Sequence, residues 1–248
     1  MSKKENPPVA KVESAPATRA DNPPAVQAEI PPIIAVDGPA ASGKGTVAAA
    51  VAAALNFHYL DSGSFYRVIA LRALERGAPL DDAAAIAPLA IELDAVFRPG
   101  EILLDGRDVT QAIRSEAVSD AASRVAVHPA VRRAILAGQR SFLRPPGLVA
   151  DGRDMGTVVF PEARLKVFIT ASAEERARRR YKQLIAKGNS VTLESLLRDI
   201  RERDARDAGR AAAPLELAAE AVILDTTDLT IDAAIDRVLA RYRAMTQE

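Results

Sequence analysis

The sequence predicts an α/β fold, in which a parallel β-sheet lies between layers of helices. Near its start, a short apolar run at 33–36 leads through a glycine-rich loop into an alanine- and valine-rich helical stretch at 46–55. Four further apolar runs, at 57–60, 148–150, 165–170 and 221–224, alternate with helical stretches, as in parallel sheets covered on both faces. With 248 residues, of which 48% are hydrophobic, the chain can bury a sizeable core.

The composition describes a protein without a strong overall charge. Lysine and arginine total 33, and aspartate and glutamate also total 33, so no global positive field favours a nucleic-acid backbone or an anionic membrane. The chain has no cysteine, which excludes disulfides and thiolate metal sites and fits the cytoplasm. No apolar run is long enough to span a bilayer. We therefore expect a cytoplasmic protein that binds small molecules, and neither nucleic acid nor membrane. We also expect a monomer.

The first 32 residues differ from the rest of the chain. They contain seven of the sixteen prolines and very few large apolar side chains. Such a segment cannot bury enough apolar surface to offset the entropy lost on ordering. The sequence predicts a disordered tail over residues 1–32 and one folded domain over residues 33–248.

The predicted strands end in residues that can carry chemistry. Ligands of parallel α/β sheets collect at the carboxyl ends of the strands. Asp37, Asp61, Asp151 and Thr170 all lie at such ends. We therefore expect a site along this edge.

One segment, at about 91–113, departs from the alternation of strands and helices. Its apolar pairs around an Asp105-Gly106 turn predict short antiparallel strands. The stretches before and after it, 81–92 and 116–143, have the composition of helices. The segment is predicted to be an insertion into the α/β domain.

A glycine-rich loop with a lysine follows the first strand and precedes the first helix. Backbone N–H groups of such a loop turn inward around a phosphate, and the lysine reaches the β- and γ-phosphates of a nucleotide. The alternative without a ligand is a glycine-rich turn with an exposed lysine, which the flanking strand and helix disfavour. The loop consists of Gly38, Pro39, Ala40, Ala41, Ser42, Gly43, Lys44, Gly45 and Thr46.

The loop departs from the general phosphate-loop pattern at one position. That pattern has serine or threonine directly after the lysine, whereas here Gly45 intervenes before Thr46. The Gly-Lys-Gly-Thr form resembles the loop of nucleoside-monophosphate kinases. The base-reading Asn-Lys-x-Asp and switch Asp-x-x-Gly motifs of nucleotide switch proteins do not occur in the sequence. These observations favour a P-loop phosphotransferase that uses ATP.

Residues after the second strand can bind the other substrate. Arg67 can pair with a phosphate through two parallel hydrogen bonds, and Ser62 and Tyr66 can bind a sugar or a base. A helix cap at Ser62 with a surface arginine is the alternative interpretation of this segment.

The stretch Asp151-Gly-Arg-Asp follows another predicted strand, so it delivers more charged side chains to the same edge. Asp151 is suited to hold Mg²⁺ through water, with Thr46 as the other expected metal ligand. Arg153 suits an acceptor phosphate. Asp154, when ionised, can accept a hydrogen bond from the N4 amino group of cytosine and would repel the O4 oxygen of uracil. An Arg153–Asp154 salt bridge without any ligand is the competing hypothesis.

Residues 38–46, 60–67 and 151–161 together resemble bacterial cytidylate kinases, and the likeness continues from 33 to about 245. The resemblance implies transfer of the γ-phosphoryl group of ATP to CMP or dCMP, with Mg²⁺. It implies a three-layer P-loop fold with a CMP-binding insertion at about 62–145 and an arginine-rich lid at about 176–190. The proline-rich tail lies outside the resemblance.

The same resemblance implies roles for individual side chains. Ser123, Arg132 and Asp154 are expected to read cytosine, and Arg67, Arg153 and Arg210 to hold the phosphate of CMP. Ser62, Tyr66, Arg203 and Asp207 are expected around the ribose, and Arg179 beside ATP. The residues expected to act on the transferred phosphoryl group are Lys44, Arg153, Arg179, Arg203 and Arg210.

The arginines near the C-terminal end also have an ordinary interpretation. Arg203, Arg206 and Arg210 fall on one face of a predicted helix, where Arg203 and Asp207 can pair at i, i+4. Such solvated pairs are common, and a basic helix can also bind nucleic acid.

Three alternatives to a CMP kinase stay open on the sequence: a kinase for UMP or AMP, a nucleotide-sensing protein without catalysis, and a nucleic-acid binder.

Overall fold

The computed structural model describes residues 30–98, 100–186 and 188–246. The chain divides into two units, Met1–Ile30 and Pro31–Glu248. Of the first unit only Ile30 is described, so the disordered tail expected at residues 1–32 lies almost wholly outside the described residues. The helices and strands below all belong to the second unit.

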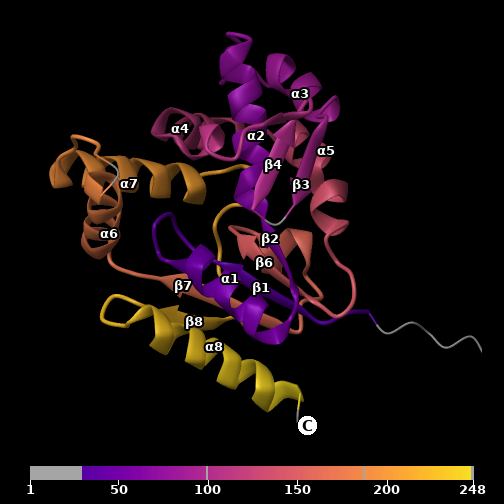
Figure 1. The fold of residues 1–248 in the computed structure, drawn as a ribbon, viewed down its shortest axis with the longest axis vertical. Coiled ribbons are helices and arrows are strands. Elements are labelled where there is room, and N and C mark those ends of the chain that lie inside the picture. The colour runs from indigo at the N-terminus through magenta and orange to yellow at the C-terminus, as the bar shows by residue number, and fades with distance from the viewer. Residues whose placement is uncertain (1–29, 99, 187, 247–248) are drawn as a thin grey trace, which may run out of the picture. The chain divides into compact units, whose positions relative to one another are not determined.

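A five-stranded parallel sheet forms the centre of this unit (Figure 1). Every neighbouring pair of strands is parallel, which confirms the predicted α/β class. Each strand lies within one or two residues of its predicted position. In order across the sheet, the strands are β2 (His58–Asp61), β6 (Leu148–Gly152), β1 (Ile33–Asp37), β7 (Leu165–Thr170) and β8 (Val222–Asp225).

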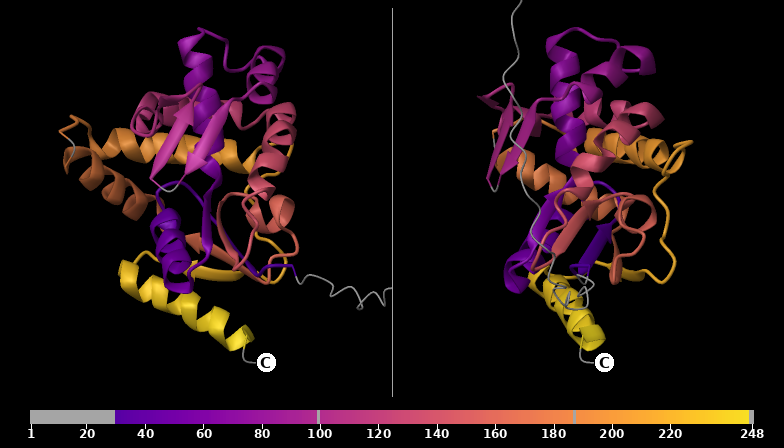
Figure 2. Two further views of the ribbon diagram at one scale, coloured as in Figure 1. Left: turned by 45° about the vertical axis from the view of Figure 1, so that its right-hand side comes forward. Right: turned by 90° about the vertical axis from the view of Figure 1, so that its right-hand side faces the viewer.

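Both faces of β1 are covered, which explains why its sequence is apolar throughout. Ile34 and Val36 pack with α1 (Lys44–Leu55) and α8 (Ile231–Thr246) in one cluster. Ile33 and Ala35 point the other way, into a cluster shared with α2 (Ser62–Glu75), α4 (Glu116–Val125) and α5 (Pro129–Arg140). The views in Figures 1 and 2 agree that α8 and α2 lie on opposite sides of the sheet.

The helical stretch predicted at 116–143 is two helices, α4 and α5, rather than one. Proline disfavours helical backbone in the residue before it. His128, which precedes Pro129, accordingly has extended backbone with ψ of 117°. The remaining helices are α3 (Ala83–Ile91), α6 (Ala173–Ala186), α7 (Leu193–Ala208), a 3₁₀ turn (Ala112–Arg114) and a π-helical turn (Met155–Val159).

The predicted antiparallel insertion is also confirmed. It consists of β3 (Ala95–Arg98), β4 (Glu101–Leu104) and β5 (Arg107–Asp108). Asp105 and Gly106 have φ of 50° and 75°, as a tight hairpin turn requires. Phe97 of β3 stacks on Phe65 of α2 with ring centroids 4.1 Å apart, so the small sheet shares the core of the domain.

Among the helices that the structure describes, none has both the length and the apolar composition needed to cross a bilayer.

Candidate active site

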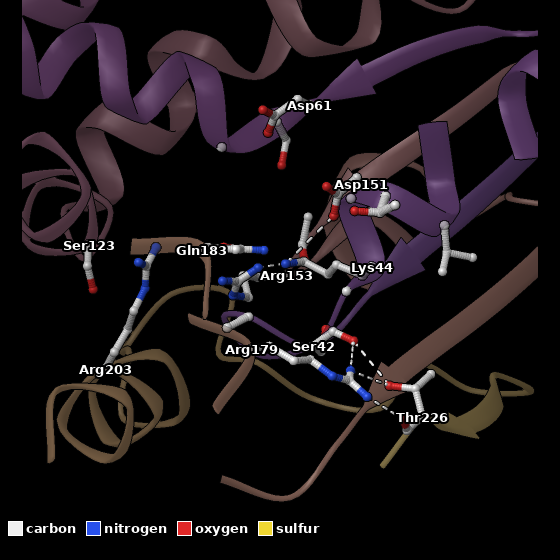
Figure 3. Close-up of a pocket in the computed structure, with 18 of the residues that line it drawn as sticks. Ser42, Lys44, Asp61, Ser123, Asp151, Arg153, Arg179, Gln183, Arg203 and Thr226 are labelled. Atoms are coloured by element: carbon white, nitrogen blue, oxygen red, sulfur yellow. Dashed lines mark hydrogen bonds and ion pairs between the residues drawn. The ribbon is translucent and has the colours of Figure 1, made fainter. Parts of the chain in front are cut away.

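A cavity of about 640 Å³ lies at the carboxyl ends of the central strands. Its walls come from the phosphate loop, the turns after β2 and β6, helices α4 to α7, and the segment after β8. Lys44 and Arg153 lie near its middle, between Thr226 on one side and Ser123 with Arg203 on the other (Figure 3). The cavity therefore lies at the edge of the sheet where the sequence predicts a site.

The cavity is electropositive although the whole chain is neutral. Among the described residues that line it, eight are lysine or arginine and four are aspartate or glutamate. Charges focused in a cleft with low-dielectric walls attract ligands of opposite sign. This local excess suits a ligand with several negative charges, such as a nucleotide phosphate.

Lys44 is the first residue of α1 and is 9% exposed. Its Nζ donates to the Pro39 carbonyl at 3.4 Å and lies 3.8 Å from Asp151 Oδ1. Burial, together with the positive charge of Arg153, lowers the pKa of Lys44 to about 8. The lysine is thus still a cation at neutral pH, and an anionic ligand would stabilise its charge.

Six of the nine predicted loop residues, Ala41 to Thr46, line the cavity. Gly38 packs against β7 instead. A Cβ at Gly38, which has φ of 151°, would lie 2.0 Å from the Ile169 carbonyl oxygen. This glycine lets the loop leave β1 tightly packed against its neighbour.

Asp151 ends β6 beside the phosphate loop. The hydroxyl of Tyr59 donates to Asp151 Oδ2 at 3.3 Å, while Oδ1 is buried without a hydrogen-bond partner. A Cβ at Gly45 would lie 2.9 Å from Asp151 Oδ2. Glycine in place of the usual serine or threonine therefore makes room for this carboxylate.

The donors around Asp151 fit a magnesium ion that arrives with a phosphate ligand. Mg²⁺ in such sites takes one or two protein oxygens and fills its octahedron with water and phosphate. Asp151 and Thr46 both line the cavity, and Asp151 Oδ1 is free to accept. Among the described residues there is no cluster of three or more histidines, cysteines or carboxylates that could cage a metal alone.

At the end of the cavity formed by α4 and α5, Asp154 forms a buried ion pair with Arg132. Arg132 also donates to the Ala126 carbonyl at 3.1 Å, which holds its guanidinium in place. The Ser123 hydroxyl, 2% exposed, has no partner. A carboxylate, a guanidinium and a free hydroxyl at one end of a cavity are suited to recognise a polar ring. The Arg153–Asp154 salt bridge proposed as an alternative is replaced by this pair.

Arg153 pairs with Asp207 of α7 through Nε and Oδ2 at 2.9 Å, and Arg210 pairs with the other oxygen of the same carboxylate. Burial acts to lower the pKa of Arg153, but the ion pair with Asp207 outweighs it and raises the pKa. Asp207 is 1% exposed and lies behind the two arginines. It therefore orients them from behind the cavity wall.

The expectation that Arg203, Arg206 and Arg210 share a helix face is wrong for Arg210. Helix α7 ends at Ala208, with Gly209 as its cap, so Arg210 lies in the segment that follows. Arg203 donates to the Ser119 hydroxyl of α4 at 3.0 Å and Arg206 pairs with Asp120. These long-range contacts take the place of the i, i+4 pairs that the sequence permits.

Two arginines that line the cavity, Arg203 and Arg210, have an N–H group without a partner. Nε of both Arg203 and Arg210 is buried without a partner. Burial, followed by the charge of Arg153, lowers the pKa of Arg203 to about 9. Arg67 lines the cavity near them, with one N–H donated to the Ile113 carbonyl at 3.1 Å. Such unpaired donors favour an anionic ligand.

At the opposite end, Arg179 donates to the Ser42 carbonyl at 3.2 Å and to the Thr226 hydroxyl at 3.1 Å. The guanidinium thereby joins α6 to the phosphate loop and to the end of β8 (Figure 3).

The segment after β8 also lines this end of the cavity. Thr226 and Thr227 follow the last strand directly, so the sequence places them near a donor base but predicts only a loop there. The other lining residues of this segment, which carry no signal of a site in the sequence, are Leu229, Thr230, Ile231 and Ala234.

We predict that Gly45→Ala lowers the free energy of unfolding by about 1–3 kcal/mol, because the new methyl group clashes with the Asp151 carboxylate. In an Asp151→Ala background the same change should be neutral or stabilising, since alanine favours a helix over glycine by up to about 1 kcal/mol. Urea unfolding of the four proteins measures the difference. An equal cost in both backgrounds would show that the two residues do not interact.

The profile of the cytidylate kinase family matches residues 34–244. A cytidylate kinase of Burkholderia cenocepacia is 58% identical over 212 residues, covering 86% of this chain and 93% of that protein. A cytidylate kinase of Paraburkholderia phymatum is 57% identical over 210 residues, covering 85% and 92%.

Solved structures give much weaker similarity. A shikimate kinase from Bacteroides thetaiotaomicron aligns with a TM-score of 0.44 at 12% identity, over 86% of this chain and 98% of its own. A gluconokinase from Sinorhizobium meliloti aligns with a TM-score of 0.42 at 17% identity, over 86% and 97%. The family profile and the relatives at 57–58% identity show that the chain belongs to the cytidylate kinase family.

Proposed function

We propose that this protein transfers the γ-phosphoryl group of ATP to CMP or dCMP, producing ADP and CDP or dCDP. The observation that carries the proposal is the arrangement of one electropositive cavity. A phosphate loop and Arg179 occupy one end, and the buried Arg132–Asp154 pair with the free Ser123 hydroxyl occupies the other. Lys44 and Arg153 lie between them. Membership of the cytidylate kinase family supports the same activity.

The donor nucleotide binds along the loop. Loop N–H groups and Lys44 hold the β- and γ-phosphates, and the base lies toward Arg179 and Thr226. Thr46 and Asp151, the latter through water, would hold the Mg²⁺ that accompanies the nucleotide, and the ion would supply positive charge to the β- and γ-oxygens. The loop that binds the donor nucleotide consists of Gly38, Pro39, Ala40, Ala41, Ser42, Gly43, Lys44, Gly45 and Thr46.

The acceptor base binds against Asp154, Arg132 and Ser123. The N4 amino group of cytosine donates to the carboxylate, and its ring acceptors face the guanidinium and the hydroxyl. Uracil is rejected because its O4 would face the negative charge of Asp154. The acceptor phosphate binds Arg67, Arg153 and Arg210, and Ser62, Tyr66 and Arg203 lie around the ribose. Asp207, which the family resemblance also places near the ribose, is buried behind Arg153 and Arg210 and does not line the cavity, so we assign it the role of holding these two arginines.

Transfer depends on charge and alignment rather than on a general base. The attacking oxygen of CMP already carries negative charge, so the site need not remove a proton. Lys44, Arg153, Arg179, Arg203 and Arg210 supply fixed positive charge around the transferred group, where a low dielectric strengthens it. Their buried carboxylate partners hold several of them in place before substrates bind.

Different segments of the chain have different roles in this reaction. Residues 33–248 form the kinase, within which about 62–145 binds CMP and about 176–190 is the lid. Arg180 of α6 pairs with Glu116 of α4, so the lid meets the CMP-binding insertion. Residues 1–32 are a tail that catalysis does not require. One chain supplies both halves of the site, and we place it in the cytoplasm as a monomer.

An acceptor panel tests the proposed function. ADP release from ATP and Mg²⁺ is measured with CMP, dCMP, UMP and AMP, each titrated to saturation. The highest kcat/KM is expected with CMP or dCMP. Preferred use of UMP or AMP would make the chain a different monophosphate kinase. Binding of ATP without turnover of any acceptor would instead indicate a nucleotide sensor.

We predict that Lys44→Ala lowers kcat for CMP by about 10²–10³-fold, because a preorganised charge at the transferring phosphoryl group is lost. The fold should be retained, since the lysine contributes little to the apolar core. Steady-state kinetics and circular dichroism on the same preparation check both parts. Activity within about tenfold of wild type would contradict an electrostatic role for Lys44.

We predict that Asp154→Asn reduces kcat/KM for CMP by roughly 10- to 1000-fold, because a charge-assisted hydrogen bond of about 1.5–3 kcal/mol is lost and the base is misoriented. The ratio of CMP to UMP use should fall, because an amide can donate to O4. Some thermal stability should also be lost, since Arg132 would be left without its carboxylate. A retained CMP/UMP ratio would place base recognition at other residues.

A further inference from the structure

Asp37 is a buried carboxylate to which the proposed reaction assigns no role. It ends β1 immediately before the phosphate loop and is 5% exposed. Oδ1 accepts the backbone N–H of Met155 at 2.8 Å, and Oδ2 accepts that of Gly156, also at 2.8 Å. Since about 118 residues separate these groups in the chain, only the fold brings them together.

The two N–H groups belong to the start of the π-helical turn Met155–Val159. The first N–H groups of a helical turn have no carbonyl partner within the turn, so they need another acceptor. Asp37 lies opposite Gly152 in the parallel pairing of β1 with β6, which places its carboxylate beside the turn. It therefore caps the turn from a different strand.

The turn directly follows Arg153 and Asp154, which contact Asp207 and Arg132 respectively. Those contacts orient the guanidinium group of Arg153 and the carboxylate group of Asp154. Neither contact fixes the backbone that carries the two side chains. The backbone is held on its other side by Asp37. Met155 adds to the anchoring because its side chain is fully buried.

A carboxylate suits this task better than any other side chain of similar size. Burial raises the pKa of Asp37 to about 6, and the N–H groups of Gly156 and Met155 oppose that rise. At pH 7 the group is thus ionised, and each of its oxygens accepts one N–H. An asparagine would offer one oxygen and would turn its NH₂ group toward the other N–H.

We infer that Asp37 is a positioning residue for base selection, which holds the backbone of residues 153–156 so that Asp154 meets the base in the geometry that distinguishes cytosine from uracil. The inference rests on the proposed function. Because Asp37 also joins the phosphate loop, it sets the distance between the base-reading turn and the ATP end of the site. It acts through the turn and touches neither substrate.

The test compares the ratio of kcat/KM for CMP to that for UMP in full-length proteins. Asp37→Asn should lower this ratio by roughly 10- to 100-fold, as expected when a contact group is displaced by about 1 Å. Both acceptors are assayed on one preparation, so partial unfolding cancels from the ratio. Thr192→Ala is the matched control, because Thr192 also caps a helix end with its side chain but lies outside the segments assigned to substrate binding. Its hydroxyl accepts the Ser195 N–H at 3.1 Å at the start of α7, and its replacement should leave the ratio unchanged.

A double-mutant cycle with Asp154→Asn separates positioning from a general structural role. In the Asp154→Asn background, Asp37→Asn should change the ratio by less than about twofold, because both residues act through one contact. An equal effect in the two backgrounds, or a wild-type ratio in Asp37→Asn, would overturn the inference. Failure of wild type itself to prefer CMP would overturn the proposed function instead.

Amide hydrogen exchange gives a second measurement if Asp37→Asn does not fold. In the wild-type protein, the amide hydrogens of Met155 and Gly156 should be protected, because both donate to Asp37. Rapid exchange at both positions would show that the turn is not held by this carboxylate and would overturn the inference.

Discussion

Strand β1 pairs in parallel with β6, with Val36 opposite Asp151 and Asp37 opposite Gly152. This register places the start of the phosphate loop beside the turn that carries Arg153 and Asp154. Parallel pairing brings the two strand ends to one edge, whereas antiparallel pairing would place them at opposite edges. The cavity between the loop and the turn, and the reach of Asp37 from one to the other, both depend on it.

The charges of the site follow from the same packing. Arginine and lysine side chains are costly to bury unless they are paired. Asp207 and Asp154 supply partners for Arg153, Arg210 and Arg132, and those carboxylates are themselves almost fully buried. Arg203 and Arg210 also line the cavity, and the Nε atom of each is buried without a hydrogen-bond partner. The protein therefore carries a preorganised anion site without an overall positive charge.

The arginine network also ties separate segments together. Asp207 comes from α7, Arg153 from the end of β6 and Arg132 from α5. Arg179 joins α6 to the phosphate loop, and Arg206 joins α7 to α4. Side chains that line or adjoin the cavity thus connect α6 with the phosphate loop and α7 with α4 and the end of β6.

The central strands, the hairpin turn at Asp105-Gly106 and the phosphate loop were all predictable from the sequence. Their signals are local: apolar runs of strand length, residues that tolerate positive φ, and glycines before a lysine at a strand-to-helix boundary. The helix break before Pro129 had a local signal too, since proline restricts its predecessor. Asp151 and Asp154 could be proposed as site residues because a strand directly precedes them.

Contacts between distant segments could not be predicted in this way. Local spacing allows Arg203 to pair with Asp207, but Asp207 pairs instead with Arg153, and Arg203 reaches Ser119. The acceptor of the Met155 and Gly156 N–H groups lies in another strand. The sequence by itself determined the fold class, the order of the strands along the chain and the chemistry available at their ends, because backbone propensity and side-chain periodicity act over a few residues. Only the tertiary structure decided which charges pair and which donors stay free, because those choices depend on which strands are neighbours and on how much water their packing excludes.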